Sequence, residues 1–262
     1  MTAFPLPRSE AEIVLALRAS GSVFAEDEAA LLVAESSSST ELDRMVDRRV
    51  AGEPLEVILG WAEFCGLRVI IHPGVFVPRH RTEFLVAQAV PLAAPGVIVV
   101  DLCCGSGALG MALEAAVPGV VLLAADIEPI AVECARANLD GIGEVFQGDL
   151  FDALPPDLRG TVDLLMVNAP YVPSAAVEWM PPEARLHEPL AALDGGTDGL
   201  DIHRRVAAAA CEWLAPGGTL LIETGEAQAD YAVAIFEHNG LAARVEYSEE
   251  YDATVVLGRR AR

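Results

Sequence analysis

The feature that most constrains the fold of this sequence is a regular alternation of strand-length apolar segments with segments of helical periodicity from residue 97 onward. Strands are predicted at 97–103, 120–127, 144–148, 162–168 and 219–224. Helices are predicted between them at 108–117, 129–139, 200–214 and 226–239. Short apolar strands that alternate with helices are typical of a parallel sheet covered on both faces. Two last strands, at 243–248 and 253–257, complete a doubly wound α/β fold with an antiparallel edge.

The first part of the chain has a different pattern, which predicts a separate small domain. Between residues 9 and 50 the apolar residues, such as Ile13 and Leu17, recur at helical spacing. We therefore expect a helical domain at 1–65, with partner recognition as its function. Residues 66–80 are predicted to form a β-hairpin linker that turns at His72-Pro73-Gly74, and residues 81–262 the α/β domain.

Composition limits the partners and the location of the protein. The formal net charge is −22. A protein that binds phosphate backbones normally presents a basic face, so we expect no nucleic acid partner. No apolar run reaches the roughly 18 residues that cross a bilayer, and the five cysteines have no disulfide spacing. These features predict a cytoplasmic protein without a membrane partner, and they leave the oligomeric state open.

A glycine-rich turn between the first α/β strand and its helix is the predicted cofactor site. Gly105, Gly107 and Gly110 match the G-x-G-x-x-G pattern of dinucleotide sites. However, Asp101 and Asp126 end two successive strands and Asp149 follows the third, and such a set repels a pyrophosphate. It favours S-adenosylmethionine, which carries a cationic amino group and a sulfonium. The predicted cofactor residues are Asp101, Cys103, Cys104, Gly105, Ser106, Gly107, Asp126, Ile127, Asp149, Leu150 and Asn168. We expect no metal site, because Cys103 and Cys104 have no nearby partner of ligand spacing.

The fourth strand ends in Asn168-Ala169-Pro170-Tyr171, which resembles the Asn-Pro-Pro-Tyr motif of amino-methyltransferases. These enzymes methylate planar nitrogens of adenine or of glutamine amides, on a Rossmann-like methyltransferase sheet. The resemblance implies that the Asn168 side chain and the Ala169 carbonyl accept the two amide hydrogens and that Tyr171 packs on the planar group. It therefore implies a catalytic set of Asn168, Ala169, Pro170 and Tyr171. Ala169 replaces the usual first proline, although Pro170 still favours an extended conformation at Ala169.

Longer matches make the resemblance more specific. Segments 48–55, 60–67, 76–83, 188–200 and 216–218 resemble the protein glutamine N-methyltransferases that modify peptide-chain release factors. The resemblance implies that a release factor is the protein substrate and that Glu188, with Asn168 and Tyr171, binds it. It also implies a cleft between the two domains that admits the acceptor loop. The chain resembles a divergent branch, because His80-Arg81 stands where the family usually has Pro-Glu, and Cys103-Cys104 replaces Gly-Cys or Gly-Thr.

Several alternatives stay open on the sequence alone. The acceptor is a glutamine amide, another protein group or a small molecule, or the chain binds the cofactor without turnover. An adenine acceptor fits the motif but conflicts with the charge, and a dehydrogenase fits only the glycine spacing. Cofactor binding separates the dehydrogenase from the methyltransferases, and methyl transfer to a release factor separates an enzyme from a protein that only binds the cofactor.

Overall fold

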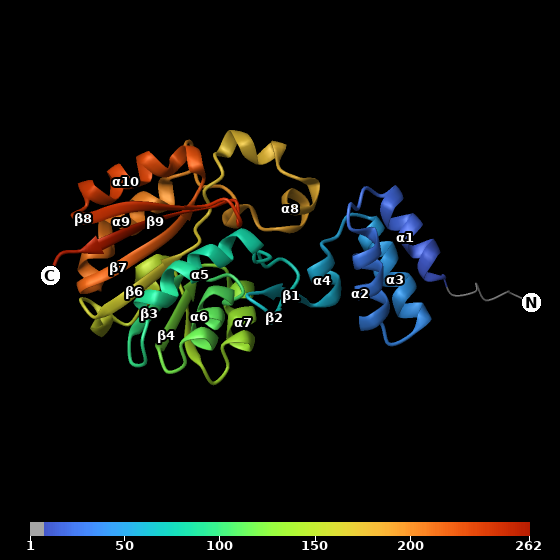
Figure 1. The fold of residues 1–262 in the computed structure, drawn as a ribbon, viewed down its shortest axis with the longest axis horizontal. Helices are drawn as coiled ribbons and strands as arrows, with labels where there is room; N and C mark the ends of the chain where they lie inside the picture. The colour runs from blue at the N-terminus through green and yellow to red at the C-terminus, as the bar shows by residue number, and fades with distance from the viewer. Residues whose placement is uncertain (1–7) are drawn as a thin grey trace, which may run out of the picture.

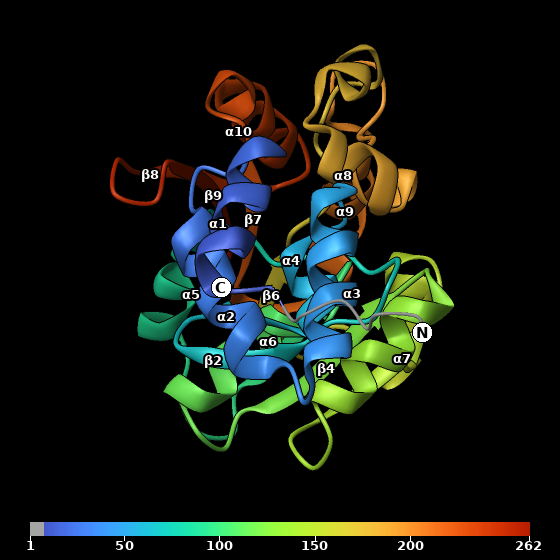
Figure 2. The same ribbon diagram turned by 90° about the vertical axis from the view of Figure 1, so that its right-hand side faces the viewer.

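A computed structural model describes residues 8–262, which form a small helical part and a large α/β part (Figure 1). The helical part lies at the end of the molecule opposite the C-terminus. Seen along the long axis in Figure 2, its helices stand in front of the α/β part. The predicted fold class is confirmed: the α/β part is a doubly wound, mostly parallel sheet with helices on both faces.

The central sheet has seven strands in the order β5-β4-β3-β6-β7-β9-β8. Its strands are β3 (Ile98–Leu102), β4 (Val121–Asp126), β5 (Gly143–Gln147), β6 (Val162–Val167), β7 (Leu214–Thr224), β8 (Leu241–Ser248) and β9 (Ala253–Arg260). The first five are parallel to one another, and β9 pairs antiparallel with both β7 and β8. The chain runs outward from β3 to β5 and then crosses to β6 on the other side of β3. This reversal creates the crevice in which open α/β sheets bind ligands.

Two apolar layers hold the helices on the sheet. Helices α5 (Glu83–Ala89), α6 (Ala108–Ala116) and α7 (Pro129–Asn138) pack on one face, against side chains that include Val99, Met166 and Leu221. Helices α9 (Asp201–Trp213) and α10 (Ala229–His238) pack on the other, against Val100 and Ile222. Since neighbouring strand residues point to opposite faces and both faces are covered, the central strands β3, β4 and β6 are largely apolar along their length.

The helical part consists of α1 (Glu10–Ala19), α2 (Ala25–Glu35), α3 (Ser39–Val50) and the short α4 (Leu55–Leu59). Ser9 and Glu12 form a capping box at the start of α1, which satisfies two free backbone N–H groups. The part has its own core around Leu17 and Leu32. Helix α4 joins the two parts, because Ile58 belongs to this core while Val57 belongs to the core of the α/β part.

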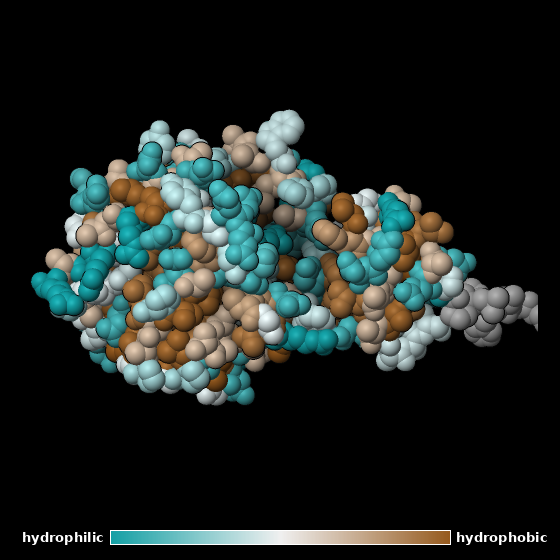
Figure 3. All heavy atoms as spheres, in the orientation of Figure 1, coloured by the Kyte–Doolittle hydropathy of each residue, from teal (hydrophilic) through white to brown (hydrophobic). Residues whose placement is uncertain are grey.

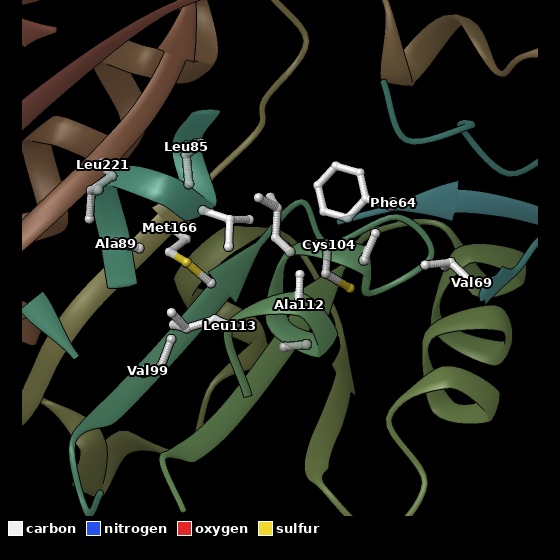
Figure 4. Close-up of a cluster of buried hydrophobic side chains, with 14 of the residues drawn as sticks. Phe64, Val69, Leu85, Ala89, Val99, Cys104, Ala112, Leu113, Met166 and Leu221 are labelled. Carbon is white, nitrogen blue, oxygen red and sulfur yellow. The ribbon is translucent and has the colours of Figure 1, made fainter. Parts of the chain in front are cut away.

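A hairpin of β1 (Trp61–Phe64) and β2 (Leu67–Ile70) connects the parts. A hairpin was predicted in this region, but the predicted turn at His72-Pro73-Gly74 is wrong. The chain reverses at Cys65-Gly66, both of which have positive φ, as a two-residue hairpin turn requires. Phe64 and Val69 lie in the same apolar cluster as Cys104 of the glycine-rich loop (Figure 4), so the hairpin is anchored beside that loop.

The remaining elements differ from the predicted ones mainly at their ends. Strand β7 begins at Leu214 rather than residue 219, because Leu214 pairs with Val162 and the register shifts after that pair. Strand β9 extends to Arg260 as the partner of β8. Helix α5 and the helix α8 (Pro182–His187) were not predicted from the sequence.

Candidate functional site

A cavity of about 240 Å³ opens at the carboxyl ends of the parallel strands. Nine predicted site residues line it: Cys103, Asp126, Ile127, Asp149, Leu150, Asn168, Ala169, Pro170 and Tyr171. They come from four different segments, so the fold gathers most of the candidate residues into one place. Asp101, Cys104, Gly105, Ser106, Gly107 and Glu188 are not part of its wall.

The glycine-rich loop forms a tight passage from β3 into α6. Gly107 begins the helix with φ +79°, and a Cβ there would lie 3.1 Å from Leu139 and 3.3 Å from Ala135. The position therefore requires glycine for two reasons, its conformation and its close contact with α7. Asn138 of α7 fixes the loop further, because its Nδ2 donates to the Ser106 carbonyl and to the Ile70 carbonyl of the hairpin.

Asp126 at the end of β4 supports the loop and also faces the cavity. Its Oδ2 accepts a hydrogen bond from the Gly105 N–H at 2.8 Å, and its Oδ1 accepts from the Glu128 N–H at 2.9 Å. Burial raises the pKa of the carboxyl, and these hydrogen bonds partly offset the shift. Each carboxylate oxygen keeps a free lone pair, so Asp126 remains able to accept hydroxyl groups from a ligand.

Asp101 lies fully buried beneath the loop rather than in the cavity wall. Its Oδ2 accepts from the Gly110 N–H at 3.1 Å, and its Oδ1 has no hydrogen-bond partner among the described residues. Burial raises the pKa of Asp101 to about 7. A buried carboxylate without a cation is costly, and such a group stabilises a cation that arrives nearby.

Asp149, after β5, forms an ion pair with Arg205 of α9 at 2.8 Å. Both side chains line the cavity, and both are about half exposed. Ile127 lies exposed next to Asp126 and adds an apolar surface to the same end of the cavity. We call this region, lined by Asp126, Ile127, Asp149, Leu150 and Arg205, the cofactor end.

Asn168 and Tyr171 form the other end of the cavity, which we call the acceptor end. The Asn168 Nδ2 donates to the Thr82 hydroxyl at 3.3 Å, which leaves Oδ1 as the available acceptor of the side chain. Tyr171 donates from its hydroxyl to Glu223 Oε1 at 2.8 Å. Burial, followed by the neighbouring Glu223 charge, raises the pKa of Tyr171 well above its ordinary value, so the phenol stays protonated.

Glu188 holds an arginine of the acceptor end instead of lining the cavity. Its Oε1 accepts from Arg79 at 2.6 Å and from the Val77 N–H at 3.3 Å. Arg79 itself lines the cavity, beside Phe76. The predicted contact between Glu188 and the acceptor stays a prediction, and the carboxylate reaches the site in this structure through Arg79.

Sequence reasoning missed several residues of the cavity wall, among them Arg81, Arg205 and Glu223. Glu223 had a detectable signal, because it is the acidic residue at the end of the fifth parallel strand, where the other strand ends supplied candidates. Arg205 had none, since an arginine on an amphipathic helix is ordinary.

Burial raises the pKa of the Cys103 thiol, and residues 8–262 contain no cluster of side chains suited to hold a metal ion.

Comparisons with known proteins identify the family of this chain. The family model described as methyltransferase small domain matches residues 66–188. A release factor glutamine methyltransferase of Geobacter sulfurreducens is 41% identical over 75% of this chain and 69% of its own length. The chain belongs to the release factor glutamine methyltransferase family. It is therefore a methyltransferase, and enzymes of this class in general use S-adenosylmethionine.

The family also includes relatives with other acceptors in their names. A 4-amino-L-phenylalanine/4-methylamino-L-phenylalanine methyltransferase of Streptomyces pristinaespiralis is 39% identical over 74% of this chain and 69% of its own length. A methyltransferase structure from Pyrococcus furiosus has a TM-score of 0.57 at 15% identity, covering 84% of this chain and 99% of that one. This last likeness supports the fold alone.

The residues at the cofactor end fit an adenosyl ligand with a cationic methionine part. The unpartnered Asp101 oxygen is buried under the glycine-rich loop, and Asp126 lines the cavity. Among the described residues, each of the three arginines of the cavity wall, Arg79, Arg81 and Arg205, is paired with a carboxylate. Within the described residues, no helix is long and apolar enough to cross a membrane.

Proposed function

We propose that this enzyme transfers a methyl group from S-adenosylmethionine to the side-chain amide of a glutamine in a peptide-chain release factor. The observation that carries the proposal is the placement of Asn168, Ala169 and Tyr171 in one cavity wall, with the Asn168 amide oriented by Thr82. Membership of the family supports the same acceptor.

The chemistry explains why these groups suit an amide nitrogen. The lone pair of an amide nitrogen is delocalised, so the nitrogen is a poor nucleophile and must be held precisely. Asn168 Oδ1 and the Ala169 carbonyl are acceptors that suit the two N–H groups. Hydrogen bonds from these N–H groups strengthen as the nitrogen gains positive charge, so they stabilise the transition state more than the ground state. Bound S-adenosylmethionine supplies a methyl group activated by its sulfonium.

The cofactor would be held by the opposite end of the cavity. We infer that Asp126 accepts the ribose hydroxyls, that Asp149 accepts from the adenine amino group, and that Ile127 and Leu150 cover the adenine. We infer that Asp101, with the loop of Cys103, Cys104, Gly105, Ser106 and Gly107, receives the cationic methionine part. The raised pKa of Asp101 then requires that cofactor binding weakens as the pH falls below about 7.

The protein substrate would approach over the hollow between the two parts of the molecule, which is visible in Figure 3. Within the described residues, the helical part contributes nothing to the cavity wall itself. It nevertheless contacts the segment above the cavity, because Arg49 of α3 pairs with Glu183 of α8 at 3.0 Å. We propose that residues 1–65 recognise the release factor at a distance from the reacting atoms, in a cytoplasmic enzyme that binds no nucleic acid.

The test is methyl transfer from labelled S-adenosylmethionine to purified release factor, beside a factor whose acceptor glutamine is replaced by alanine. We expect label that requires both the glutamine and Asn168 of the enzyme. A parallel reaction with 4-amino-L-phenylalanine covers the second acceptor class, which the Streptomyces relative suggests. Label on the amine and none on the factor would overturn the glutamine proposal.

A further inference from the structure

Three side chains from distant segments meet at the acceptor end of the cavity. Tyr171 donates its hydroxyl to Glu223 Oε1 at 2.8 Å, and Arg81 Nε lies 3.3 Å from the same oxygen. The Arg81 guanidinium also lies over the Tyr171 ring, with its Cζ 5.7 Å from the ring centroid. The tyrosine is therefore restrained both at its hydroxyl and on one ring face.

The backbone at Glu223 is held in place by the sheet and by a buried histidine. It lies near the end of β7, and the pairing of Val167 with Ile222 places Asn168 and Glu223 next to each other on neighbouring strands. The His203 Nε2 hydrogen-bonds to the Glu223 carbonyl at 3.1 Å and fixes the backbone there. Only 2% of the Glu223 side chain is exposed.

The buried carboxylate of Glu223 is paired with Arg81. Within residues 8–262, Arg81 is the only cation that forms an ion pair with this buried carboxylate. A buried carboxylate that loses its partner is strongly destabilised. Removing the arginine takes away its contact with the ring. It also leaves the Glu223 carboxylate without its ion-pair partner, so we expect the carboxylate to move and to displace the tyrosine hydroxyl that is bonded to it.

We propose that Arg81 and Glu223 are positioning residues that fix the Tyr171 ring, so that the orientation of the acceptor depends on a pair that does not touch the transferred methyl group. The link to acceptor orientation rests on the proposed function, whereas the restraint on the ring does not. The cofactor end contains none of the three residues, so the affinity for the cofactor is independent of the pair.

The experiment compares Arg81→Gln and Glu223→Gln with a matched control, Arg159→Gln. Arg159 has the same kind of surroundings away from the cavity, since it pairs with Glu212 at 3.2 Å and lies 5.1 Å from the Trp213 ring centroid. Tyrosine rings labelled with ¹³C are observed by NMR in the ligand-free enzyme. The chain has four tyrosines, so Tyr171→Phe identifies the Tyr171 signal by its loss.

We expect the Tyr171 signal to shift or broaden in Arg81→Gln and Glu223→Gln and to stay unchanged in Arg159→Gln. With release factor as acceptor, we expect kcat/KM to fall about 10-fold to 100-fold in the two variants, because misplacement of about 1 Å has effects of that size. The Kd of S-adenosylmethionine should stay within about threefold, since neither residue is predicted to touch the cofactor. In the double variant the losses should not add, because both changes break one unit.

An unchanged Tyr171 signal in both variants would overturn the proposal. So would a loss of cofactor affinity as large as the loss of turnover. If the wild-type enzyme transfers no methyl group to release factor, the proposed function fails, while the NMR comparison still decides whether the pair holds the ring.

Discussion

The two ends of the cavity contain similar acidic side chains in opposite electrostatic situations. Near the cofactor end, Asp101 and Asp126 have raised pKa values and form no ion pair within the described residues, whereas the half-exposed Asp149 is paired with Arg205. At the acceptor end, each of the two buried carboxylates has an arginine, Glu188 with Arg79 and Glu223 with Arg81, although one oxygen of each has no hydrogen-bond partner among the described residues and burial raises the pKa of Glu188.

This difference indicates which ligand each end accepts. A carboxylate left without a cation is stabilised by a ligand that brings one, as S-adenosylmethionine does. A carboxylate already matched by an arginine adds little net charge, so it suits a neutral acceptor such as an amide. The charges of the site therefore predict which end binds the cofactor and which end binds the acceptor.

The largest expected effect is at the acceptor end. Asn168→Ala removes the side-chain oxygen that we propose accepts a hydrogen bond from the acceptor amide, and losing one such group costs about 100-fold to 1,000-fold in kcat. The Kd of S-adenosylmethionine, measured by calorimetry, should change by less than about fivefold, because Asn168 is only one of many predicted cofactor contacts. Equal losses in turnover and in cofactor affinity would contradict the assignment of separate binding roles to the two ends.

Asp101→Asn should mainly affect the binding of the cofactor rather than that of the acceptor. We expect cofactor affinity to fall about 10-fold to 100-fold at pH 8, since a charge partner of the cofactor is lost. The ligand-free protein should become more stable at that pH, by about 2 kcal/mol, because a buried unpaired charge is removed. Chemical denaturation with and without the cofactor measures both effects.

The sign of the pH dependence of Asp101 follows from its raised pKa of about 7. The folded state binds the proton more tightly than the unfolded chain does. The stability that this group contributes is therefore present at low pH and is lost as the pH rises from about 4 to about 7. In Asp101→Asn this component should be absent, and a wild-type-like pH dependence in the variant would contradict the assignment.

His203, which lies beneath the acceptor end, should give the stability a pH dependence of the opposite sign. Burial lowers its pKa to about 4, so the folded state favours the neutral ring. Its contribution to stability is present above about pH 6.5 and is lost as the pH falls toward 4. The His203→Gln variant should not lose stability in this way. The stability advantage of the wild type over the variant should therefore shrink by about 2 kcal/mol between pH 7 and pH 5. Denaturation curves at the two pH values test this, and an advantage that does not shrink rules out the buried neutral histidine.

The smallest effect is expected for Arg205→Gln at the rim of the cofactor end. The ion pair with Asp149 is about half exposed, and pairs of this kind contribute about 0–1 kcal/mol. We expect a change of less than about 1 kcal/mol in stability and about twofold to fivefold in cofactor affinity. A larger loss would show that the rim, and not the buried acids, holds the cofactor.

The regular parts of the fold could be predicted because local pattern and tertiary environment agree there. Strands β3, β4 and β6 are largely apolar, and the glycine-rich turn follows shortly after β3. The hairpin was misplaced because His72-Pro73-Gly74 is a stronger turn signal than Cys65-Gly66, whose left-handed conformation only the paired strands reveal. Short helices such as α8 depend on tertiary packing and carry little periodicity of their own.

The candidate site shows a similar division. Residues at strand ends, such as Asp126 and Asn168, could be predicted because parallel strands deliver their carboxyl ends to one edge. Pairings across the cavity could not, because the contact of Arg81 with Glu223 joins residues far apart in the sequence that share no motif. The bond between Glu188 and Arg79 is another such pairing, and the contact of Glu188 with the acceptor, which the family resemblance implies, stays a prediction.

The most direct test of the divided cavity is a crystal structure of the enzyme with S-adenosylhomocysteine and a peptide that contains the acceptor glutamine. We predict that the adenosyl group contacts Asp126 and Asp149, that the amino group of the homocysteine part lies on the side of Asp101, and that the glutamine amide contacts Asn168 and Tyr171. A glutamine bound away from Asn168, or a cofactor product whose amino group lies toward Arg79 and Arg81, would contradict the account.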